Sequence, residues 1–327
     1  MDTIEKDIII IGGGPSGLAC ALEAAKLQMD YLVLEKGFLV NSIYNFPTNM
    51  TFFSTSQVLE IGEVPFISHT DKPSRKEALE YYRRVAESYN LDIRFRQKVA
   101  SVNKNKFLFE IKTQDNLYKC QYLVVATGYY DTPNMLKVPG EMLPKVKHYY
   151  DDAHPYIGQE IVVVGAANSA CDVALETYYK GATVTMIIKD ETIYEKVKYW
   201  IRPNIINRIK EGSIKAYFSS QIKEILPEYI IVDTPEGKIQ LKNDYVLAMT
   251  GYRPDFPFLE SLGIDMSEEE HIPTYHPETL ESNVPQMYLA GVILAGNNTS
   301  KLFIENTRHH GKMIMMDIHQ KLSESYA

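Results

Sequence analysis

The chain has 327 residues, of which 45% are hydrophobic and 23% charged, and its formal net charge is −8. This length predicts two domains, each with its own core, and the composition excludes a disordered or low-complexity protein. The acidic balance, without a basic cluster to neutralise phosphates, argues against a nucleic-acid partner. No apolar run reaches the roughly 18 residues of a membrane span, so we expect no membrane partner either.

The cysteines and the N-terminus indicate a compartment. Cys20, Cys120 and Cys171 are odd in number and far apart, and there is no C-x-x-C motif. This pattern argues against a disulfide framework and against a metal site. The chain enters a predicted strand within seven residues and lacks the features of a signal or transit peptide. We therefore expect a cytoplasmic protein.

The first motif is a complete βαβ unit at residues 8–36. The run Ile8–Ile11 predicts a strand buried on both faces of a parallel sheet. Gly12, Gly14 and Gly17 fit G-x-G-x-x-G, in which the glycines allow a tight turn, close approach to a pyrophosphate and helix packing. A helix opening near Ser16 would aim free amides at that diphosphate. Together with Glu35, described next, the pattern favours a dinucleotide site over a glycine-rich turn without a ligand.

Glu35 ends the second strand of this unit, predicted at residues 31–34. It follows the glycines by roughly 20 residues, the distance at which an acid binds the two ribose hydroxyls of a dinucleotide. Residues 37–68 have no clear period and predict an ordered loop with one short helix, of a length that is more often functional than idle.

A helix and a meander follow this loop. Pro73 starts a helix with an apolar stripe at Ala78, Tyr82, Val85 and Tyr89. A parallel strand is expected at 92–95. An antiparallel meander is expected over 99–102, 106–112 and 117–125, ending at Ala126-Thr127-Gly128.

The pattern then repeats. Residues 161–189 predict the same strand, turn, helix and strand, followed by a second meander with a hairpin at 235–237 and a strand at 245–249. Pro133, Pro139 and Gly140 mark residues 131–140 as the crossover between domains. We expect one dinucleotide-binding domain of residues 1–130 and 254–327 and a second, inserted dinucleotide-binding domain of residues 131–253. The predicted fold class is α/β, with two Rossmann-like three-layer domains that each carry an antiparallel β-meander.

The second glycine-rich turn departs from the first. Gly165 and Ala170 occupy the first and third glycine positions, but Ala167 replaces the glycine that lets backbone approach a pyrophosphate. Asn168 and Ser169 could donate to phosphate in compensation. Dinucleotide binding is favoured, and a repeat without a ligand stays open.

The nucleotide preference of this second turn rests on the end of its second strand. Ile188 stands opposite Glu35, so the ribose-binding acid is missing, and Lys189 follows. A lysine here favours a 2′-phosphate and hence NADPH over NADH. The charges around it are mixed: Lys196, Lys198 and Arg202 would add positive charge, and Asp190 and Glu191 would oppose it.

The last segment predicts a strand at 287–289, then Ala290-Gly291-Val292 and a helix from about Phe303. In this helix Met313, Ile314 and Met316 are interpreted as core residues, with a role at a cofactor left open. His309 and His310 are predicted to be surface or cap residues rather than ligands.

Three short motifs join the two glycine-rich turns to a known family. Ala126-Thr127-Gly128 closes the first half, residues 250–255 (TGYRPD) close the second, and Ala290-Gly291 stands near the end. In this order the chain resembles the two-dinucleotide flavoproteins, and among them the low-molecular-weight thioredoxin reductases. It resembles the bacillithiol disulfide reductases most closely, through residues 46–62, 197–213 and 290–311.

The resemblance implies FAD in the first domain, NADPH in the second and hydride transfer from the nicotinamide to the flavin. The implied FAD contacts are Gly12, Gly14, Pro15, Ser16, Gly17, Glu35, Lys36, Val99, Thr127, Gly128 and Gly291, with Thr48 and Phe303 near the ring. The implied NADPH contacts are Gly165, Asn168, Ser169, Ala170, Lys189, Lys198 and Arg202.

Two positions depart from the patterns of the wider group. Val292 replaces the aspartate that most of these flavoproteins use to bind the ribityl chain, as the bacillithiol branch also tends to do. Ser16 replaces a cysteine that many bacillithiol disulfide reductases carry beside the flavin. Cys20 and Cys171 are predicted to be core residues. No catalytic residue is identified.

We expect an FAD-dependent NADPH oxidoreductase that reduces a low-molecular-weight disulfide such as bacillithiol disulfide, or a small redox protein, without a protein dithiol. A homodimer or homotetramer is expected. The alternatives are a ferredoxin or flavodoxin reductase, a flavin monooxygenase and a non-catalytic flavin-binding sensor. The net negative charge disfavours the acidic carriers of the first. Gly140 and His148 only weakly resemble the monooxygenase fingerprint.

Overall fold

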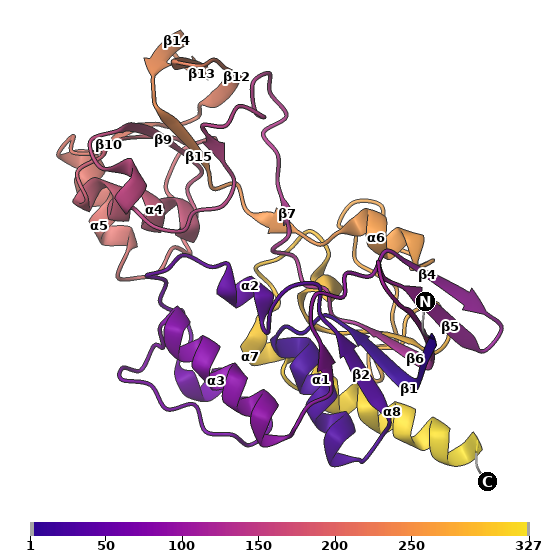
Figure 1. Cartoon of the computed structure of the whole chain (residues 1–327). Helices are drawn as coiled ribbons and strands as arrows, with labels where there is room; N and C mark the ends of the chain where they lie inside the picture. Colours follow the sequence, from indigo (N-terminus) through magenta and orange to yellow (C-terminus); the bar gives the residue numbers. More distant parts are fainter. Residues whose placement is uncertain (1–2, 326–327) are drawn as a thin grey trace. The chain divides into compact units, whose positions relative to one another are not determined.

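The computed structural model of the protein describes residues 3–325, and the chain divides into two compact units (Figure 1). Unit 1 comprises Met1–Thr132 and Tyr252–Ala327, and unit 2 comprises Pro133–Gly251. The two connecting segments pair with each other as the short strands β7 (Thr132–Pro133) and β16 (Tyr252–Arg253). No helix in residues 3–325 combines the length and apolar character needed to cross a membrane.

Unit 1 is built on a mixed sheet with the order β3-β2-β1-β6-β5-β4, in which β17 also pairs with β6. Its central strand β1 is parallel to both β2 and β6. The four isoleucines that end β1 are 5% exposed or less, as expected for a strand covered on both faces. The strands are β1 (Thr3–Ile11), β2 (Tyr31–Leu34), β3 (Ile93–Arg94), β4 (Ser101–Asn105), β5 (Leu108–Lys112), β6 (Leu117–Val125) and β17 (Met287–Leu289).

The strand β6 is nine residues long, so its two halves can pair with different strands. Its first half pairs antiparallel with β5, so the predicted meander of β4, β5 and β6 is confirmed. Its second half pairs in parallel with β17. The meander is therefore continuous with the parallel sheet, and β6 carries the chain from the meander to the sheet edge at Ala126.

The helices of unit 1 cover this sheet and form a second apolar cluster beside it. They are α1 (Pro15–Lys26), α2 (Asn41–Tyr44), α3 (Arg75–Ser88), α6 (Phe256–Ser261), α7 (Ile304–Thr307) and α8 (His310–Ser325), with 3-10 turns η1 (Ser56–Leu59) and η3 (Gly291–Ala295). Ser74 caps α3 in a reciprocal capping box with Glu77. Ala78, Tyr82 and Val85 of the predicted stripe are fully buried.

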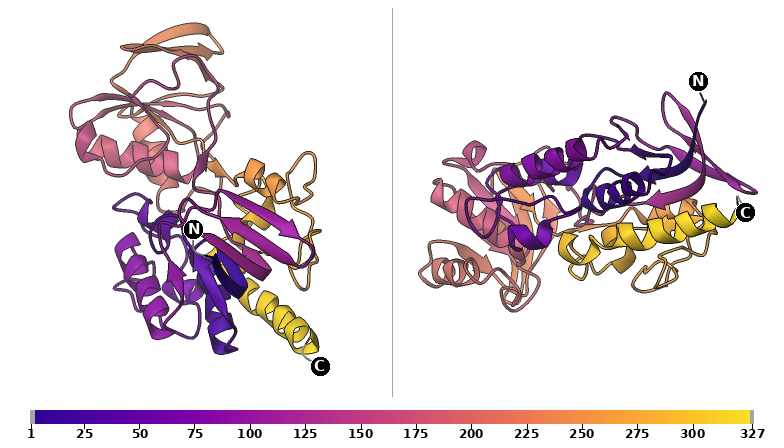
Figure 2. Two further views of the ribbon diagram at one scale, coloured as in Figure 1. Left: turned by 45° about the vertical axis from the view of Figure 1, so that its right-hand side comes forward. Right: turned by 90° about the horizontal axis from the view of Figure 1, so that it is seen from below.

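The C-terminal helix is split where one helix was predicted from Phe303. Arg308 and His309 separate α7 from α8, and α8 runs alongside α1 (Figures 1 and 2). Ile314 and Met315 are fully buried in the core, whereas Met316 is 59% exposed. The prediction that Met316 fills the core is wrong, because the phase of α8 turns that position away from the sheet.

Unit 2 repeats the arrangement on a smaller scale, as the sequence predicts. Its five strands are all parallel, in the order β11-β10-β9-β15-β8. They are β8 (Val146–Lys147), β9 (Glu160–Val164), β10 (Thr183–Ile187), β11 (Lys215–Tyr217) and β15 (Tyr245–Ala248), and the helices are α4 (Asn168–Tyr179) and α5 (Arg202–Lys210), with the 3-10 turn η2 (His154–Tyr156).

A separate three-stranded antiparallel sheet completes unit 2. It consists of β12 (Gln221–Ile225), β13 (Tyr229–Thr234) and β14 (Gly237–Lys242). The register of β13 and β14 closes at Thr234 and Gly237. This places the turn at the predicted hairpin and confirms the second meander.

Candidate dinucleotide sites

The sheet of unit 1 brings four loops to one edge. Ile11 is in register with Leu34 and Val125, and Leu289 is in register with Val125. The carboxyl ends of β1, β2, β6 and β17 therefore lie at the same level, and residues 12–17, 35–37, 126–128 and 290–292 leave the sheet there. Ligands bind at this edge in open parallel sheets.

Two of the three glycines in the first turn are required by the protein itself. A Cβ on Gly17 would lie 1.9 Å from the carbonyl oxygen of Gly12. Gly12 has a φ of +109°, and its Cβ would lie 2.4 Å from the carbonyl oxygen of Ala126. Both glycines let the backbones of α1, β1 and the loop after β6 meet directly.

Gly14 is different, because no contact within the described part of the chain requires a glycine there. Its φ of −76° and ψ of 176° suit any residue. A Cβ on Gly14 would meet no atom of residues 3–325 within 4 Å. Gly14 is the N-cap of α1, which has no side-chain cap. The glycine thus leaves space in front of a helix N-terminus, the geometry that suits a phosphate group.

The carboxylate of Glu35 is fixed at this edge. It accepts hydrogen bonds from the amides of Gly13 and Gly37, both at 2.7 Å, and Glu35 is 4% exposed. Burial raises the pKa of Glu35, and the two amide hydrogen bonds oppose that shift. The neighbouring Lys36 side chain forms an ion pair with Asp131.

The remaining predicted residues of unit 1 lie at or near the same edge. The hydroxyl oxygen of Thr127 is buried and has no hydrogen-bond partner among the described residues, and Gly128 has a φ of +70°. Val99 is half-buried and lies two residues after Gln97, whose amide donates to the carbonyl of Glu35 at 2.9 Å. A buried hydroxyl left unpaired beside this cradle is a group that a bound ligand would satisfy.

Thr48 and Phe303 lie on two further segments of unit 1. Thr48 is half-buried in the loop after α2. Phe303 is 47% exposed and is the N-cap residue of α7. Its carbonyl accepts a hydrogen bond from Thr307, whose hydroxyl lies 3.3 Å from that of Ser16. Pro15 is the first residue of α1, where its missing N–H costs nothing.

His310 was predicted to be a surface or cap residue, and the structure corrects this. Its side chain is half-buried, and Nδ1 accepts a hydrogen bond from the amide of Gly291 at 3.1 Å. The break between α7 and α8 turns His310 inward, a feature that the sequence pattern did not predict. His309 is exposed, as expected.

Unit 2 has an equivalent edge with different groups. The amide of Gly165 donates to the carbonyl of Ile187 at 3.1 Å, as the amide of Gly12 donates to Leu34 at 2.9 Å. The next residue in unit 2 is therefore Ile188, in the place that Glu35 takes in unit 1. Ile188 is fully buried and cannot bind a ribose.

Ala167 occupies the position of Gly14 with little backbone difference. It is the N-cap of α4, with a φ of −90° and a ψ of −172°, and it is exposed. Its methyl group projects where Gly14 leaves open space. Ser169 is exposed next to it, and Ala170 is fully buried against the strand, as a small residue at the third glycine position should be.

Not all of the predicted basic residues of unit 2 have a charge free to bind a phosphate. Lys198 is buried, and its ammonium forms an ion pair with Asp172 at 2.8 Å. Its backbone amide donates to the side-chain oxygen of Asn168 at 2.8 Å, so these two predicted residues do meet. Lys189 is exposed, and Nε of Arg202 is buried without a hydrogen-bond partner among the described residues.

The three cysteines do not form a redox centre. Cys20, Cys120 and Cys171 are free, and all are buried. Burial raises the pKa of the Cys20 and Cys171 thiols to about 12 and that of Cys120 even further. The core positions predicted for Cys20 and Cys171 are confirmed. None of the three offers a thiolate near neutral pH. No cluster of His, Cys, Asp or Glu in residues 3–325 could hold a metal ion.

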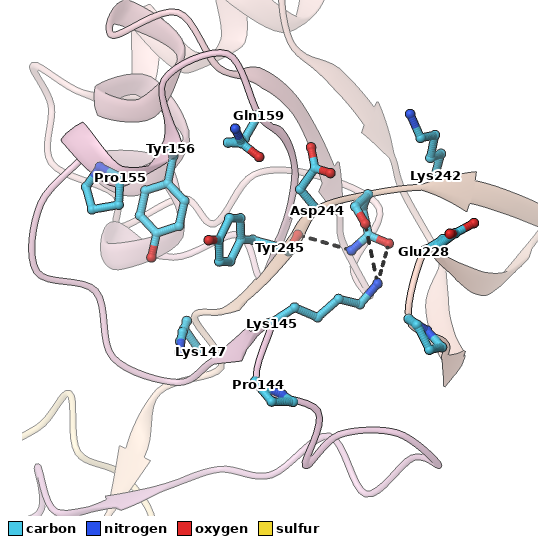
Figure 3. Close-up of a pocket in the computed structure, with 12 residues that line it drawn as sticks. Pro144, Lys145, Lys147, Pro155, Tyr156, Gln159, Glu228, Lys242, Asp244 and Tyr245 are labelled. Carbon is cyan, nitrogen blue, oxygen red and sulfur yellow. Dashed lines mark hydrogen bonds between the residues drawn. The ribbon is translucent and has the colours of Figure 1, made fainter.

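A pocket of about 710 Å³ lies elsewhere in unit 2 (Figure 3). Its lining includes Gln159, Asp244 and Tyr245, which stand at the start of β9 and β15. Nζ of Lys145 donates to the side-chain oxygen of Asn243 at 3.0 Å and to its backbone carbonyl at 3.4 Å. The pocket is at the amino ends of the parallel strands and contains none of the predicted site residues.

Alanine substitutions at Gly17 and Gly14 should differ in their effect on the stability of the protein without a ligand. We expect Gly17→Ala to lower the free energy of unfolding by about 1 to 3 kcal/mol, because the added methyl group collides with the Gly12 carbonyl. Gly14→Ala should leave stability unchanged within about 0.5 kcal/mol. Urea denaturation of both apoproteins measures this, and equal losses would contradict the assignment.

Comparisons with known proteins show the family and the fold. Residues 9–291 match the family described as pyridine nucleotide-disulphide oxidoreductase. The chain is 43% identical over 317 residues to the bacilliredoxin reductase Bdr of Bacillus subtilis (strain 168), covering 96% of this chain and 98% of that protein. It is similar to the solved bacillithiol disulfide reductase Bdr (YpdA) of Staphylococcus aureus, with 42% identity, a TM-score of 0.94 and coverage of 98% and 99%. The Bacillus cereus Bdr (YpdA) structure gives 42% identity, a TM-score of 0.94 and coverage of 97% and 99%.

Proposed function

The chain belongs to the Bdr (YpdA) family of bacilliredoxin and bacillithiol disulfide reductases, and from this premise we propose that it carries electrons from NADPH through FAD to a disulfide. The proposed acceptor is a low-molecular-weight disulfide such as bacillithiol disulfide, or the disulfide of a small redox protein. NADPH would be oxidised to NADP⁺ while one disulfide and one proton become two thiols. FAD, when bound, supplies the chemistry that converts a hydride into two electrons for the disulfide.

The observation that carries this proposal is the contrast between the two sheet edges. Both present a helix N-terminus without a side-chain cap, at Gly14 and at Ala167. Only unit 1 adds a buried carboxylate, Glu35, which can accept hydrogen bonds from two ribose hydroxyls. Unit 2 has Ile188 there. One edge therefore suits FAD, and the other suits a nucleotide whose 2′-position is not a free hydroxyl.

In unit 1 the proposed FAD contacts bind different parts of the cofactor. The amides after Gly14 and the helix dipole would hold the diphosphate, and Glu35 would hold the adenosine ribose. The unpaired hydroxyl of Thr127 can donate to a polar atom of the cofactor. Gly128 and Gly291, both at positive φ, let the two following loops turn away from that space.

In unit 2 the proposed NADPH contacts are fewer. Asn168 and Ser169 begin α4 and can reach the diphosphate, whereas the charge of Lys198 is already paired with Asp172. Lys189 and Arg202 are left to recognise the 2′-phosphate. The unpaired Nε of Arg202 supports this role, because a guanidinium donates well to phosphate oxygens.

The cysteines support direct transfer from the flavin to the acceptor. In disulfide exchange a thiolate attacks a sulfur, but all three thiols here are buried with a raised pKa. We therefore propose that no thiol of this chain takes part, and that the flavin is the last carrier before the substrate. Free cysteines also suit the reducing cytoplasm, where we propose that the enzyme acts.

The test is a stepwise reduction. The purified protein, loaded with FAD, should lose its visible flavin absorbance when one equivalent of NADPH is added without oxygen. Bacillithiol disulfide should restore that absorbance and release two thiols, whereas ferredoxin, flavodoxin and oxygen should restore it far more slowly. A flavin that NADPH does not bleach would contradict the proposal and favour a non-catalytic flavin-binding protein.

A cysteine-free variant is the matched control. Cys20→Ala, Cys120→Ala and Cys171→Ala together should keep disulfide turnover within about threefold, because no thiol is proposed to act. Any lost stability is measured separately by urea denaturation. A folded variant that is still bleached by NADPH but no longer reduces the disulfide would show that a thiol is needed.

Gly14→Ala should weaken FAD binding without lowering the stability of the apoprotein. The added methyl group occupies the space proposed for the diphosphate, so we expect FAD affinity to fall by about tenfold or more. Titration of the apoprotein with FAD, followed by flavin fluorescence, measures the dissociation constant. Unchanged affinity would mean that the diphosphate lies elsewhere.

Arg202→Ala should separate NADPH from NADH. We expect the KM for NADPH to rise about tenfold, the loss of one charge-assisted hydrogen bond, while the KM for NADH stays the same. Arg208→Ala, on the same helix α5 but paired with Glu211, is the control. Equal changes for both cofactors would exclude recognition of the 2′-phosphate by Arg202.

A further inference from the structure

His310 lies at the junction of α7 and α8, next to the loop that follows β17. Its Nδ1 accepts the hydrogen bond from the amide of Gly291 at 3.1 Å, across 19 residues of sequence. Gly291 is buried and starts η3. The bond therefore ties the C-terminal helix to one of the four loops at the sheet edge of unit 1.

The direction of this hydrogen bond sets the state of the histidine. Because Nδ1 accepts, it carries no proton, and the neutral ring holds its proton on Nε2. Burial, together with the neighbouring His309, lowers the pKa of His310 to about 4. The acceptor is thus available throughout the neutral pH range.

Gly291 sits in a conformation that needs support. Its φ is +85°, and a Cβ there would lie 2.6 Å from the hydroxyl oxygen of Ser16. The loop is therefore held close against the first turn of α1. The next residue, Val292, has no polar side chain with which to bind a cofactor, so the backbone shape of this loop is what it can offer.

His310 is itself held in place by backbone packing. A Cβ on the next residue, Gly311, would lie 2.4 Å from the carbonyl oxygen of Ala19, so α8 touches α1 directly. On the other side, the hydroxyls of Thr307 and Ser16 are 3.3 Å apart. These contacts fix the start of α8 on both sides of the histidine and give its ring little freedom.

We propose that His310 is a positioning residue for the flavin: its Nδ1 holds the Gly291 amide and so keeps residues 290–292 against Ser16 in the shape that receives the cofactor. This inference rests on the proposed function, because it requires FAD at this edge. It assigns no bond from His310 to the flavin itself.

The test uses three substitutions of His310, which either remove the hydrogen-bond acceptor for the Gly291 amide or place an acceptor at different positions. His310→Leu removes it. His310→Asn places a side-chain oxygen close to the position of Nδ1, whereas His310→Gln reaches toward the position of Nε2. His309→Ala is the control, because His309 is exposed. For each variant the FAD dissociation constant, the absorption spectrum and midpoint potential of the bound flavin, and the stability of the apoprotein are measured.

We expect His310→Leu to weaken FAD binding about tenfold and to shift the flavin spectrum and midpoint potential. His310→Asn should restore all three to near wild-type values, His310→Gln should not, and His309→Ala should change none of them. Wild-type affinity, spectrum and potential in His310→Leu would overturn the inference. Failure of His310→Asn to restore them would also overturn it, since then the ring and not its acceptor is needed. Failure of the wild-type protein to bind FAD would instead refute the proposed function, and the inference with it.

Discussion

The contact of Gly17 with the carbonyl of Gly12 is the constraint on which the first site depends. With only 1.9 Å between a Cβ at Gly17 and that oxygen, no side chain fits, and α1 can rest directly on the end of β1. This contact fixes the start of α1, and with it Gly14 and the open space in front of the helix. Glu35 is then held at the same edge by the amides of Gly13 and Gly37. This sheet edge is well defined because backbone, rather than mobile side chains, builds most of it.

Unit 2 keeps the backbone geometry of the glycine-rich turn but carries different side chains around it. Gly165 and Ile187 repeat the hydrogen bond of Gly12 and Leu34, so the turn has the same geometry. The residues around it differ in chemistry: Ala167 adds a methyl group, Ile188 replaces a carboxylate, and Lys198 is neutralised by Asp172. The two units thus share this backbone contact and differ in the side chains around it.

The family resemblance read from the sequence is confirmed, and the buried cysteines define how this chain fits within it. A disulfide oxidoreductase usually passes electrons through its own thiols, but here Cys20, Cys120 and Cys171 serve as core residues. The Ser16 hydroxyl bonds with that of Thr307 and supports the contact between the first turn and α7. Ser16 thus has a structural contact with Thr307, which is consistent with a flavin that reacts without a protein thiol.

The sequence by itself determined the elements that local pattern controls. The strand ending at Ile11, the strand Tyr31–Leu34, the two meanders and the repeat at Gly165 follow from β-branched runs and glycine spacing, which act over a few residues. Only the tertiary structure decided which long-range contacts form. The double pairing of β6, the break before His310, the exposure of Met316 and the pairing of Lys198 with Asp172 depend on segments distant in sequence. Periodicity carries no information about such partners. The chemistry of a residue is therefore readable from its type, but its availability is set by what the fold places beside it.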